Sequence, residues 1–189
     1  MIKTFVFLGL HGAGKGMQAD FLNKKTGYPI ISTGGELRKI VKDGKFIGKK
    51  VAEVMNSGEL MPSWFVSYIF QHALISFNEE DGIIFEGAVR KVEEARFFAE
   101  VCEWLGRDYR ILHLKVSEET VAERLSKRRD IEGRADDDPS VFETRLKNFY
   151  EHTAHSLEYF RSINKVIDID GEPLPEEVFA EIWQKISVL

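Results

Sequence analysis

The chain has 189 residues, of which 43% are apolar and 30% are charged. This length and composition suit one domain with a substantial core and exclude general intrinsic disorder. Asp and Glu number 31 against 26 Lys and Arg, which gives a formal charge of −5. Negative charge argues against a general nucleic-acid or anionic-membrane binder, so we expect no nucleic-acid or membrane partner. We expect a monomer whose partners are small molecules.

Cysteine content and apolar runs predict the location of the protein. Cys102 is the only cysteine in the sequence, so neither an internal disulfide nor a four-cysteine zinc site can form. A single thiol suits a reducing compartment. The apolar run at residues 5–10 is too short for a signal peptide, and no run approaches the roughly 20 residues that cross a bilayer. We therefore expect a cytoplasmic protein.

Short apolar segments rich in β-branched and aromatic residues alternate with longer segments of helical periodicity. The predicted strands are residues 2–8, 28–32, 82–85, 109–116 and 165–169. The predicted helices are residues 15–24, 46–56, 64–77, 93–104, 118–128, 139–161 and 175–188. This alternation is typical of βαβ units, which build a parallel sheet. The sequence therefore predicts an α/β protein.

The first predicted strand is followed at once by a glycine-rich turn, residues 9–15 (GLHGAGK). This is the G-x-x-x-x-G-K part of a P-loop. Its glycines let backbone N–H groups point into one concavity, the following helix adds the positive end of its dipole, and the lysine reaches the outer phosphates. Gly16 stands where the motif has Ser or Thr. The pattern predicts a site for a triphosphate.

Gly-Lys-Gly at residues 14–16, followed by Gln18 and Ala19, resembles the opening of the adenylate kinase family, a group of nucleoside monophosphate kinases. Further segments resemble the family in the same order along the chain. They are residues 31–38 (ISTGGELR), 55–61 (MNSGELM), 85–90 (FEGAVR), Arg124 with Arg128, 133–137 (GRADD) and 145–146 (RL). One such segment is weak, but a collinear set is specific. The resemblance extends from residue 2 to about residue 185.

The resemblance implies a P-loop NTPase-type three-layer α/β fold with a five-stranded parallel sheet. One nucleoside monophosphate kinase domain would occupy residues 1–189. Its core would comprise residues 1–32, 63–128 and 138–189, its helical monophosphate-binding insertion residues 33–62, and its short lid residues 129–137. The implied reaction transfers the γ-phosphoryl group of ATP to AMP and gives two ADP, with Mg²⁺ as cofactor.

The resemblance also assigns the residues of the ATP side. Lys15 would contact the β- and γ-phosphates, and Arg124 and Arg128 would hold the same nucleotide. The implied ATP-binding residues are Gly12, Ala13, Gly14, Lys15, Gly16, Met17, Arg124, Arg128 and Pro173. The implied catalytic residues are Lys15, Arg90, Arg128, Arg134 and Arg145, because phosphoryl transfer needs positioning and neutralisation of charge more than covalent help.

On the acceptor side, Arg38 and Arg90 would grip the monophosphate, since guanidinium groups bind phosphate oxygens in bidentate fashion. The implied AMP-binding residues are Thr33, Arg38, Glu59, Leu60, Met61, Gly87, Arg90, Glu94, Arg134 and Arg145. Glu86 stands where the family usually has Asp. It would orient water on a Mg²⁺ ion that the phosphates hold, so no direct protein ligand to the metal is expected.

Several positions depart from the family pattern. His11 and Val89 replace prolines, Met17 replaces a threonine, and Glu94 replaces a glutamine that would read adenine. Packing is the simpler role for Met17. An ionised Glu94 can only accept hydrogen bonds, which leaves a kinase of another monophosphate such as GMP as an alternative. A nucleotide-binding module with little turnover is a second alternative, against which the retained Lys15 and arginines count.

Overall fold

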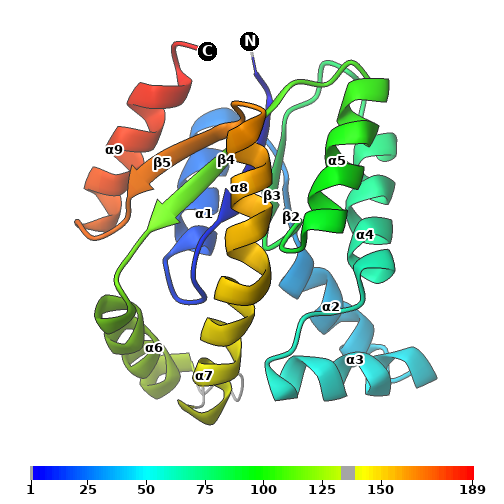
Figure 1. Ribbon diagram of the computed structural model, residues 1–189, viewed down its shortest axis with the longest axis vertical. Helices are drawn as coiled ribbons and strands as arrows, with labels where there is room; N and C mark the ends of the chain where they lie inside the picture. The colour runs from blue at the N-terminus through cyan, green and yellow to red at the C-terminus, as the bar shows by residue number, and fades with distance from the viewer. Residues whose placement is uncertain (1, 133–138) are drawn as a thin grey trace.

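The computed structural model describes residues 2–132 and 139–189, and for residues 128–132, 139 and 140 it describes the backbone alone. Strands and helices alternate along the chain (Figure 1). The elements are β1 (Thr4–Leu8), α1 (Lys15–Thr26), β2 (Ile30–Ser32), α2 (Thr33–Lys42), α3 (Phe46–Ser57), α4 (Ser63–Ser76), β3 (Ile83–Glu86), α5 (Val92–Trp104), β4 (Tyr109–Lys115), α6 (Glu118–Glu132), α7 (Pro139–Asn148), α8 (Ala154–Ser162), β5 (Val166–Asp170) and α9 (Pro175–Ile186). A π-helical turn, Phe149–Thr153, joins α7 to α8.

The strands form one five-stranded parallel sheet in the order β2-β3-β1-β4-β5. Central β1 pairs its Val6 with Phe85 of β3 and with Ile111 of β4. The chain leaves β1 toward β2 on one side, whereas β4 and β5 extend the sheet on the other. Ligands of open α/β sheets bind at the carboxyl ends of the strands, where the strand order reverses in this way. The predicted α/β class and five-stranded parallel sheet are confirmed.

Helices cover both faces of the sheet, so β1 is buried throughout. Val6 and Leu8 belong to one core cluster, which α4, α5 and α8 complete, whereas Phe5 and Phe7 point to the opposite cluster, formed with α1 and α9. This alternation follows from the period of two residues along a strand. In Figure 1, α8 lies in front of the sheet and α1 behind it. The three-layer arrangement holds the carboxyl ends of all the strands at one edge.

Helices α2 and α3 pack on a smaller core of their own. Leu37 of α2, Val51 of α3 and Phe65 of α4 are its buried residues. Both helices lie below the sheet in Figure 1, beside its carboxyl edge. The segment predicted as a helical insertion therefore contains two helices that a separate apolar cluster fixes to α4.

The structure differs from the predicted elements mainly at their ends and at one helix. Helix α2 was not among the predicted helices, because Gly34 and Gly35 in its first turn have low helix propensity. It begins directly after β2, and the Ser32 hydroxyl caps it by accepting a hydrogen bond from the Gly35 N–H at 3.2 Å. Helix α6 extends to Glu132, beyond the predicted end at residue 128. Within the described residues, no helix has both the length and the apolar character of a bilayer span.

Candidate active site

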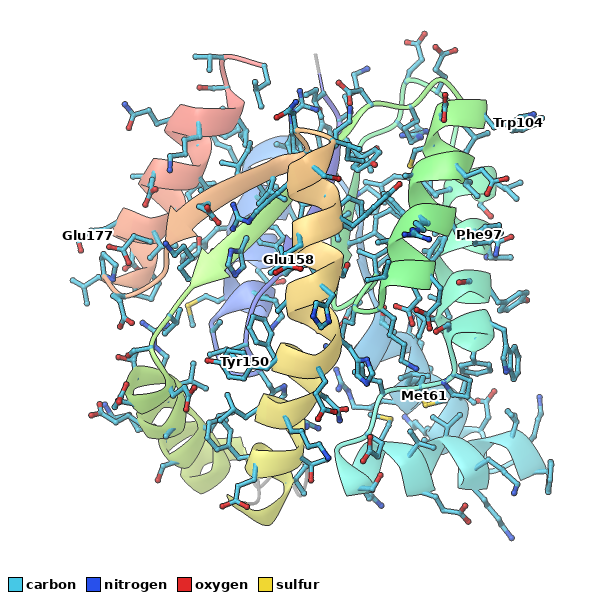
Figure 2. All side chains as sticks on the ribbon, in the orientation of Figure 1. Met61, Phe97, Trp104, Tyr150, Glu158 and Glu177 are labelled. Atoms are coloured by element: carbon cyan, nitrogen blue, oxygen red, sulfur yellow. The ribbon has the colours of Figure 1, made fainter. Side chains whose placement is uncertain are left out.

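A cavity of about 1170 Å³ opens at the carboxyl edge of the sheet. Its walls come from the P-loop and α1, the start of α2, the 58–61 loop, the end of β3, α6, and the 171–178 segment that leads into α9. Two of its lining residues, Met61 and Glu177, stand on opposite sides of α8 in Figure 2. Single small-molecule ligands fill sites of roughly 300 to 1,000 Å³. The cavity therefore exceeds what one such ligand needs.

The P-loop takes a backbone shape that needs glycine. Gly12 and Gly14 have φ angles of 91° and 92°, and a Cβ atom on Gly12 would lie 2.9 Å from Leu125 Cγ. Lys15 follows in the first turn of α1, where its buried ammonium group donates to the backbone oxygens of Gly9 at 3.0 Å and Leu10 at 2.7 Å. A positive side chain thus lies at the positive end of a helix, which is a site for anions.

Glu86 ends β3 and lines the same cavity. Burial raises the pKa of its carboxyl group, but Lys15, a 2.6 Å hydrogen bond from the Ser32 hydroxyl and the charges of Arg90 and His11 outweigh burial and hold the pKa below its ordinary value. The carboxylate is therefore ionised at neutral pH. It is an oxygen donor of the kind that Mg²⁺ or its bound water prefers.

Two cavity arginines lie against glycines. A Cβ atom on Gly87 would approach Arg90 Nη2 to 3.0 Å, and a Cβ atom on Gly34 would approach Arg38 Nη1 to 3.2 Å. Both arginines line the cavity. The absence of side chains at these glycines leaves room for two guanidinium groups, which match the geometry of phosphate oxygens.

The segment between Gly87 and Arg90 is strained. Val89 has a φ of 53°, an uncommon value for a β-branched residue, and its side chain is fully buried. The buried Ser156 hydroxyl of α8 donates a 2.6 Å hydrogen bond to the Val89 carbonyl oxygen. Strained backbone of this kind persists only where the surroundings fix it, and it gathers at functional sites. Here it directly precedes an arginine of the cavity.

Glu94, in the first turn of α5, lines the cavity with only 2% of its surface exposed. Its Oε2 atom accepts hydrogen bonds from the backbone N–H groups of Arg90 at 2.9 Å and Lys91 at 3.4 Å. Burial raises the pKa of this carboxyl group, although the two backbone hydrogen bonds oppose the rise. The carboxyl group therefore serves as a helix cap as well as part of the cavity wall.

Residues distant in the sequence complete the wall near the P-loop. Arg124 of α6 donates to the backbone oxygens of Gly171 at 2.9 Å and Glu172 at 3.2 Å, which ties α6 to the segment after β5. Arg145 of α7 contacts His11 of the P-loop through its Nη1 and the His11 Nε2. Cationic groups from two helices thus reach the loop that begins α1.

The sequence was compared with known proteins. A profile described as adenylate kinase matches residues 7–165. The chain is 35% identical over 187 residues to adenylate kinase 1 of Synechocystis sp., which covers 98% of this chain and 97% of that protein. It is 38% identical over 183 residues to the adenylate kinase of Mycobacterium tuberculosis, covering 96% of this chain and 98% of the relative. The adenylate kinase of Leptospira biflexa is 32% identical over 186 residues, 98% and 100% of the two chains.

The chain belongs to the adenylate kinase family. It is accordingly a nucleotide-binding enzyme, an ATP-dependent phosphotransferase. The predicted family resemblance is confirmed, and the P-loop at the start of α1 agrees with it.

The cavity brings together nearly all the residues that the resemblance assigned to the two nucleotides. From the ATP side it is lined by Gly12, Ala13, Gly14, Lys15, Gly16, Met17, Arg124 and Pro173. From the AMP side it is lined by Thr33, Arg38, Glu59, Leu60, Met61, Gly87, Arg90, Glu94 and Arg145. Arg134 and the side chain of Arg128 lie outside the described residues, as does most of the predicted lid.

Some residues of the site had no predicted role. The Gln18 amide, in the first turns of α1, donates to the Pro175 oxygen at 2.9 Å and so joins the P-loop helix to α9. Asn148 donates 3.2 Å hydrogen bonds to the Gly58 oxygen and to Glu59 Oε2, which fixes the 58–61 loop from the end of α7. These contacts join segments distant in the sequence, so no local pattern indicates them.

Met17, which departs from the family pattern, does not have the packing role that the sequence suggested. Met17 is 51% exposed and lines the cavity, so its side chain is not a core packing residue. The sequence offers no other residue with a hydroxyl group in this first turn of α1, which reads Lys15, Gly16 and Met17. Backbone N–H groups are therefore the hydrogen-bond donors that this turn presents besides Lys15.

Proposed function

We propose that this enzyme transfers the γ-phosphoryl group of ATP to AMP and releases two molecules of ADP. One observation supports the proposal above others: a single cavity larger than one ligand needs has a P-loop on one side and Arg38 with Arg90 on the other. The P-loop accepts the triphosphate, and the two arginines accept a monophosphate. Two phosphate chains can then meet inside one cavity.

On the donor side, the backbone N–H groups of residues 12–17 and the Lys15 ammonium group hold the β- and γ-phosphates. Arg124 and Arg128 add positive charge along the triphosphate, and Pro173 borders the donor base. By the family pattern, Arg134 and Arg145 would neutralise charge on the donor and acceptor phosphates; of the two, Arg134 lies outside the described residues. These roles rest on the family pattern and on the placement of the described residues around the cavity.

On the acceptor side, Arg38 and Arg90 bind the AMP phosphate and aim one of its oxygens at the γ-phosphorus. That oxygen forms the new P–O bond while the bond between the γ-phosphorus and the β,γ-bridging oxygen breaks, and the bond electrons leave with ADP. Thr33, Gly87, Glu94 and the 59–61 loop enclose the nucleoside. No protein group forms a covalent bond, so positioning and charge neutralisation supply the catalysis.

Mg²⁺ fits the residues present. Within the described chain no group of three or more His, Cys, Asp or Glu side chains is arranged to hold a metal ion. We propose, as the family resemblance implies, that the ion would enter with the nucleotide phosphates. The ionised Glu86 carboxylate faces the same cavity and would hold water bound to the ion. When bound, Mg²⁺ supplies neutralisation of phosphate charge.

We further propose that residues 1–189 form one domain, with residues 33–62 as the monophosphate-binding insertion and residues 129–137 as the lid. A single chain carries every assigned residue, so one chain is the catalytic unit, as the expected monomer requires. The buried thiol of Cys102 supports a reducing location such as the cytoplasm.

The test is a coupled assay of ADP formation from ATP with AMP, GMP, CMP and UMP. We expect AMP to be the best acceptor. Lys15→Met should fold normally and lower kcat/KM at least about 10²-fold, because it removes a charge aimed at the transferring phosphate. Lys24→Met, which alters an exposed lysine of the same helix, is the matched control and should keep full activity. Near-normal turnover in folded Lys15→Met would refute the proposal.

A further inference from the structure

His11 lies in a tight turn of the P-loop, at a position where the family pattern has a proline. The Ala13 N–H donates to the Leu10 carbonyl oxygen at 3.1 Å and closes this turn, whose central residues are therefore positions 11 and 12. Gly12 has a φ of 91°, which is typical of the second central residue of a type II turn, and such turns favour proline at the first. The backbone of the turn does not require a histidine, so what His11 adds is its imidazole ring.

The imidazole ring of His11 contacts Arg145 of α7, which lies 134 positions further along the chain. The contact joins Arg145 Nη1 to His11 Nε2. A guanidinium group has only N–H donors, so the Nε2 atom is the acceptor, and a ring that accepts at Nε2 is neutral with its proton on Nδ1. In acid, a protonated His11 presents to Glu86 the positive charge that helps to lower the pKa of this carboxyl group, and it then offers Arg145 no acceptor.

The stem of Arg145 is fixed from another side. A Cβ atom on Gly58 would lie 3.4 Å from Arg145 Cγ, so the aliphatic part of this arginine packs on a glycine of the 58–61 loop. Asn148, at the end of the same helix, donates to the Gly58 carbonyl oxygen at 3.2 Å and ties the loop to α7. Helix α7 and the 58–61 loop thus place the stem of Arg145, whereas His11 of the P-loop holds its guanidinium group.

Other cations surround this guanidinium group. Lys15, Arg90 and Arg145 line the main cavity, and the two arginines with His11 also line a small cavity of about 20 Å³ beside the P-loop. Before phosphates bind, like charges repel one another, and an arginine side chain has many rotamers to adopt. Both effects favour an Arg145 side chain that points away from the phosphate site. A neutral imidazole opposes both effects, because it binds the guanidinium group without adding charge.

We propose that His11 is a positioning residue that holds the guanidinium group of Arg145 over the P-loop before nucleotides bind. This inference rests on the proposed function, in which Arg145 neutralises charge on the phosphates. A guanidinium group can bind an imidazole through one nitrogen and phosphate oxygens through the others, so His11 need not release Arg145 when nucleotides enter. Ordering the side chain in advance lowers the entropy that is lost when Arg145 meets the phosphates.

A double-mutant cycle tests whether His11 acts through Arg145. His11→Pro suits the turn but removes the acceptor, and it should lower kcat/KM for ADP formation about tenfold. In an Arg145→Ala background the same change should have a further effect of less than about twofold, because the partner of the imidazole is already absent. His11→Gln carries an amide oxygen at a reach similar to that of Nε2 and should keep kcat/KM within about twofold of wild type.

The matched control is His155→Gln, which makes the same change at an exposed histidine of α8 that lines neither cavity. It should have the activity of wild type, and all the variants should retain wild-type circular dichroism. A histidine that only shapes the loop would give the same loss in both backgrounds and no rescue by glutamine. Either of those results, or a His11→Pro protein with full activity, would overturn the proposal.

NMR of the ring nitrogens in the nucleotide-free protein at neutral pH observes the contact directly, because it shows which nitrogen carries the proton. The signals of His11 are identified by their loss in His11→Gln. Wild type should show a neutral ring with its proton on Nδ1, and Arg145→Ala should lower the population of this tautomer. A wild-type ring that is protonated, or that carries its proton on Nε2, would also contradict the proposal. No nucleotide enters this measurement, so a failure of the proposed function would leave its result unchanged, and the two proposals fail independently.

Discussion

Replacement of Glu94 by glutamine tests how the acceptor base is chosen. Glu94 is buried in the cavity wall, and the amide oxygen of a glutamine can accept the same two backbone N–H groups of Arg90 and Lys91. The helix cap therefore survives the change. What changes is the free end of the side chain, which in glutamine always carries N–H donors. Adenine presents a ring nitrogen that accepts a hydrogen bond, and an ionised carboxylate cannot donate one.

The magnitude follows from one hydrogen bond. A bond gained between neutral groups contributes about 0.5 to 1.5 kcal/mol, and 1.4 kcal/mol is a factor of ten. Glu94→Gln should therefore raise kcat/KM for AMP by up to about tenfold above neutral pH and sharpen discrimination against GMP. Guanine offers N–H donors on the corresponding edge, so the ionised carboxylate of the wild type favours GMP in comparison.

The pH dependence has a definite sign. Burial raises the pKa of Glu94, so the folded enzyme keeps the neutral acid to higher pH than an exposed glutamate does. The neutral acid can donate to adenine as glutamine does. The advantage of Glu94→Gln with AMP should therefore shrink as pH falls toward 5. The same linkage makes the wild type less stable as pH rises from about 4.5 through the raised pKa, a loss that Glu94→Gln avoids.

The assay is ADP formation with all four monophosphates between about pH 5 and pH 9, for wild type, Glu94→Gln and Glu93→Gln. Glu93 is the exposed neighbour in the same helical turn, and its variant should match wild type. An AMP rate and an acceptor ranking that are unchanged in Glu94→Gln at every pH would refute the reasoning. Such a result would reduce Glu94 to a helix cap.

Three other substitutions probe neighbouring features. Met17→Thr adds a hydroxyl group to the P-loop turn and should raise kcat/KM several-fold; weaker ATP binding at equal stability would show that the missing hydroxyl is unimportant. Ser156→Ala removes the buried hydrogen bond to the Val89 carbonyl and should cost about 1 to 3 kcal/mol in denaturant unfolding while raising KM for AMP. Hydrogen bonds from Arg161 and, to a smaller extent, from His113 lower the pKa of Asp168. Asp168→Asn should reduce the free energy of unfolding by about 1 kcal/mol, a small value because the side chains of Asp168 and Arg161 are both more than a third exposed. In thermal unfolding, the stability difference between wild type and Asp168→Asn should become smaller below pH 4, where the carboxyl group becomes protonated in the unfolded state. The same difference at every pH would contradict the linkage.

Local patterns predicted the sheet well because each strand, like the P-loop, is specified by a short contiguous segment of the sequence. Each of the five strands lies within two residues of its predicted bounds. Helix α2 escaped prediction because its stability comes from tertiary contacts, with Leu37 packed on Val51 and Phe65. The two glycines in its first turn lower its helix propensity, so the local sequence does not indicate a helix there. Propensity is overridden where packing contributes more free energy.

The P-loop side of the site could be predicted from local sequence, whereas the opposite wall could be predicted only from the family resemblance. The P-loop gave Lys15 its position from spacing alone, since strand, turn and helix are adjacent in the chain. The residues of the opposite wall come from five separate segments, and only the family resemblance associated them. The partners of their side chains were beyond either approach. The Glu94 carboxyl group caps a helix, and Asn148 fixes the 58–61 loop, because of tertiary contacts that no spacing encodes.

The charges around the cavity give a physical reason why a divalent cation would accompany the phosphates. Lys15 and Arg90 stabilise the ionised Glu86 carboxylate before any nucleotide binds. When phosphates enter, they attract the same two cations and face Glu86 as a like charge across the cavity. A buried carboxylate that loses its cationic partners raises the free energy of the folded protein. A divalent cation bound to the phosphates would offset this repulsion, and the Glu86 carboxylate would hold water on that ion. Glu86→Gln should therefore make turnover less dependent on Mg²⁺ concentration, and it should have a smaller effect on the affinity for AMP alone.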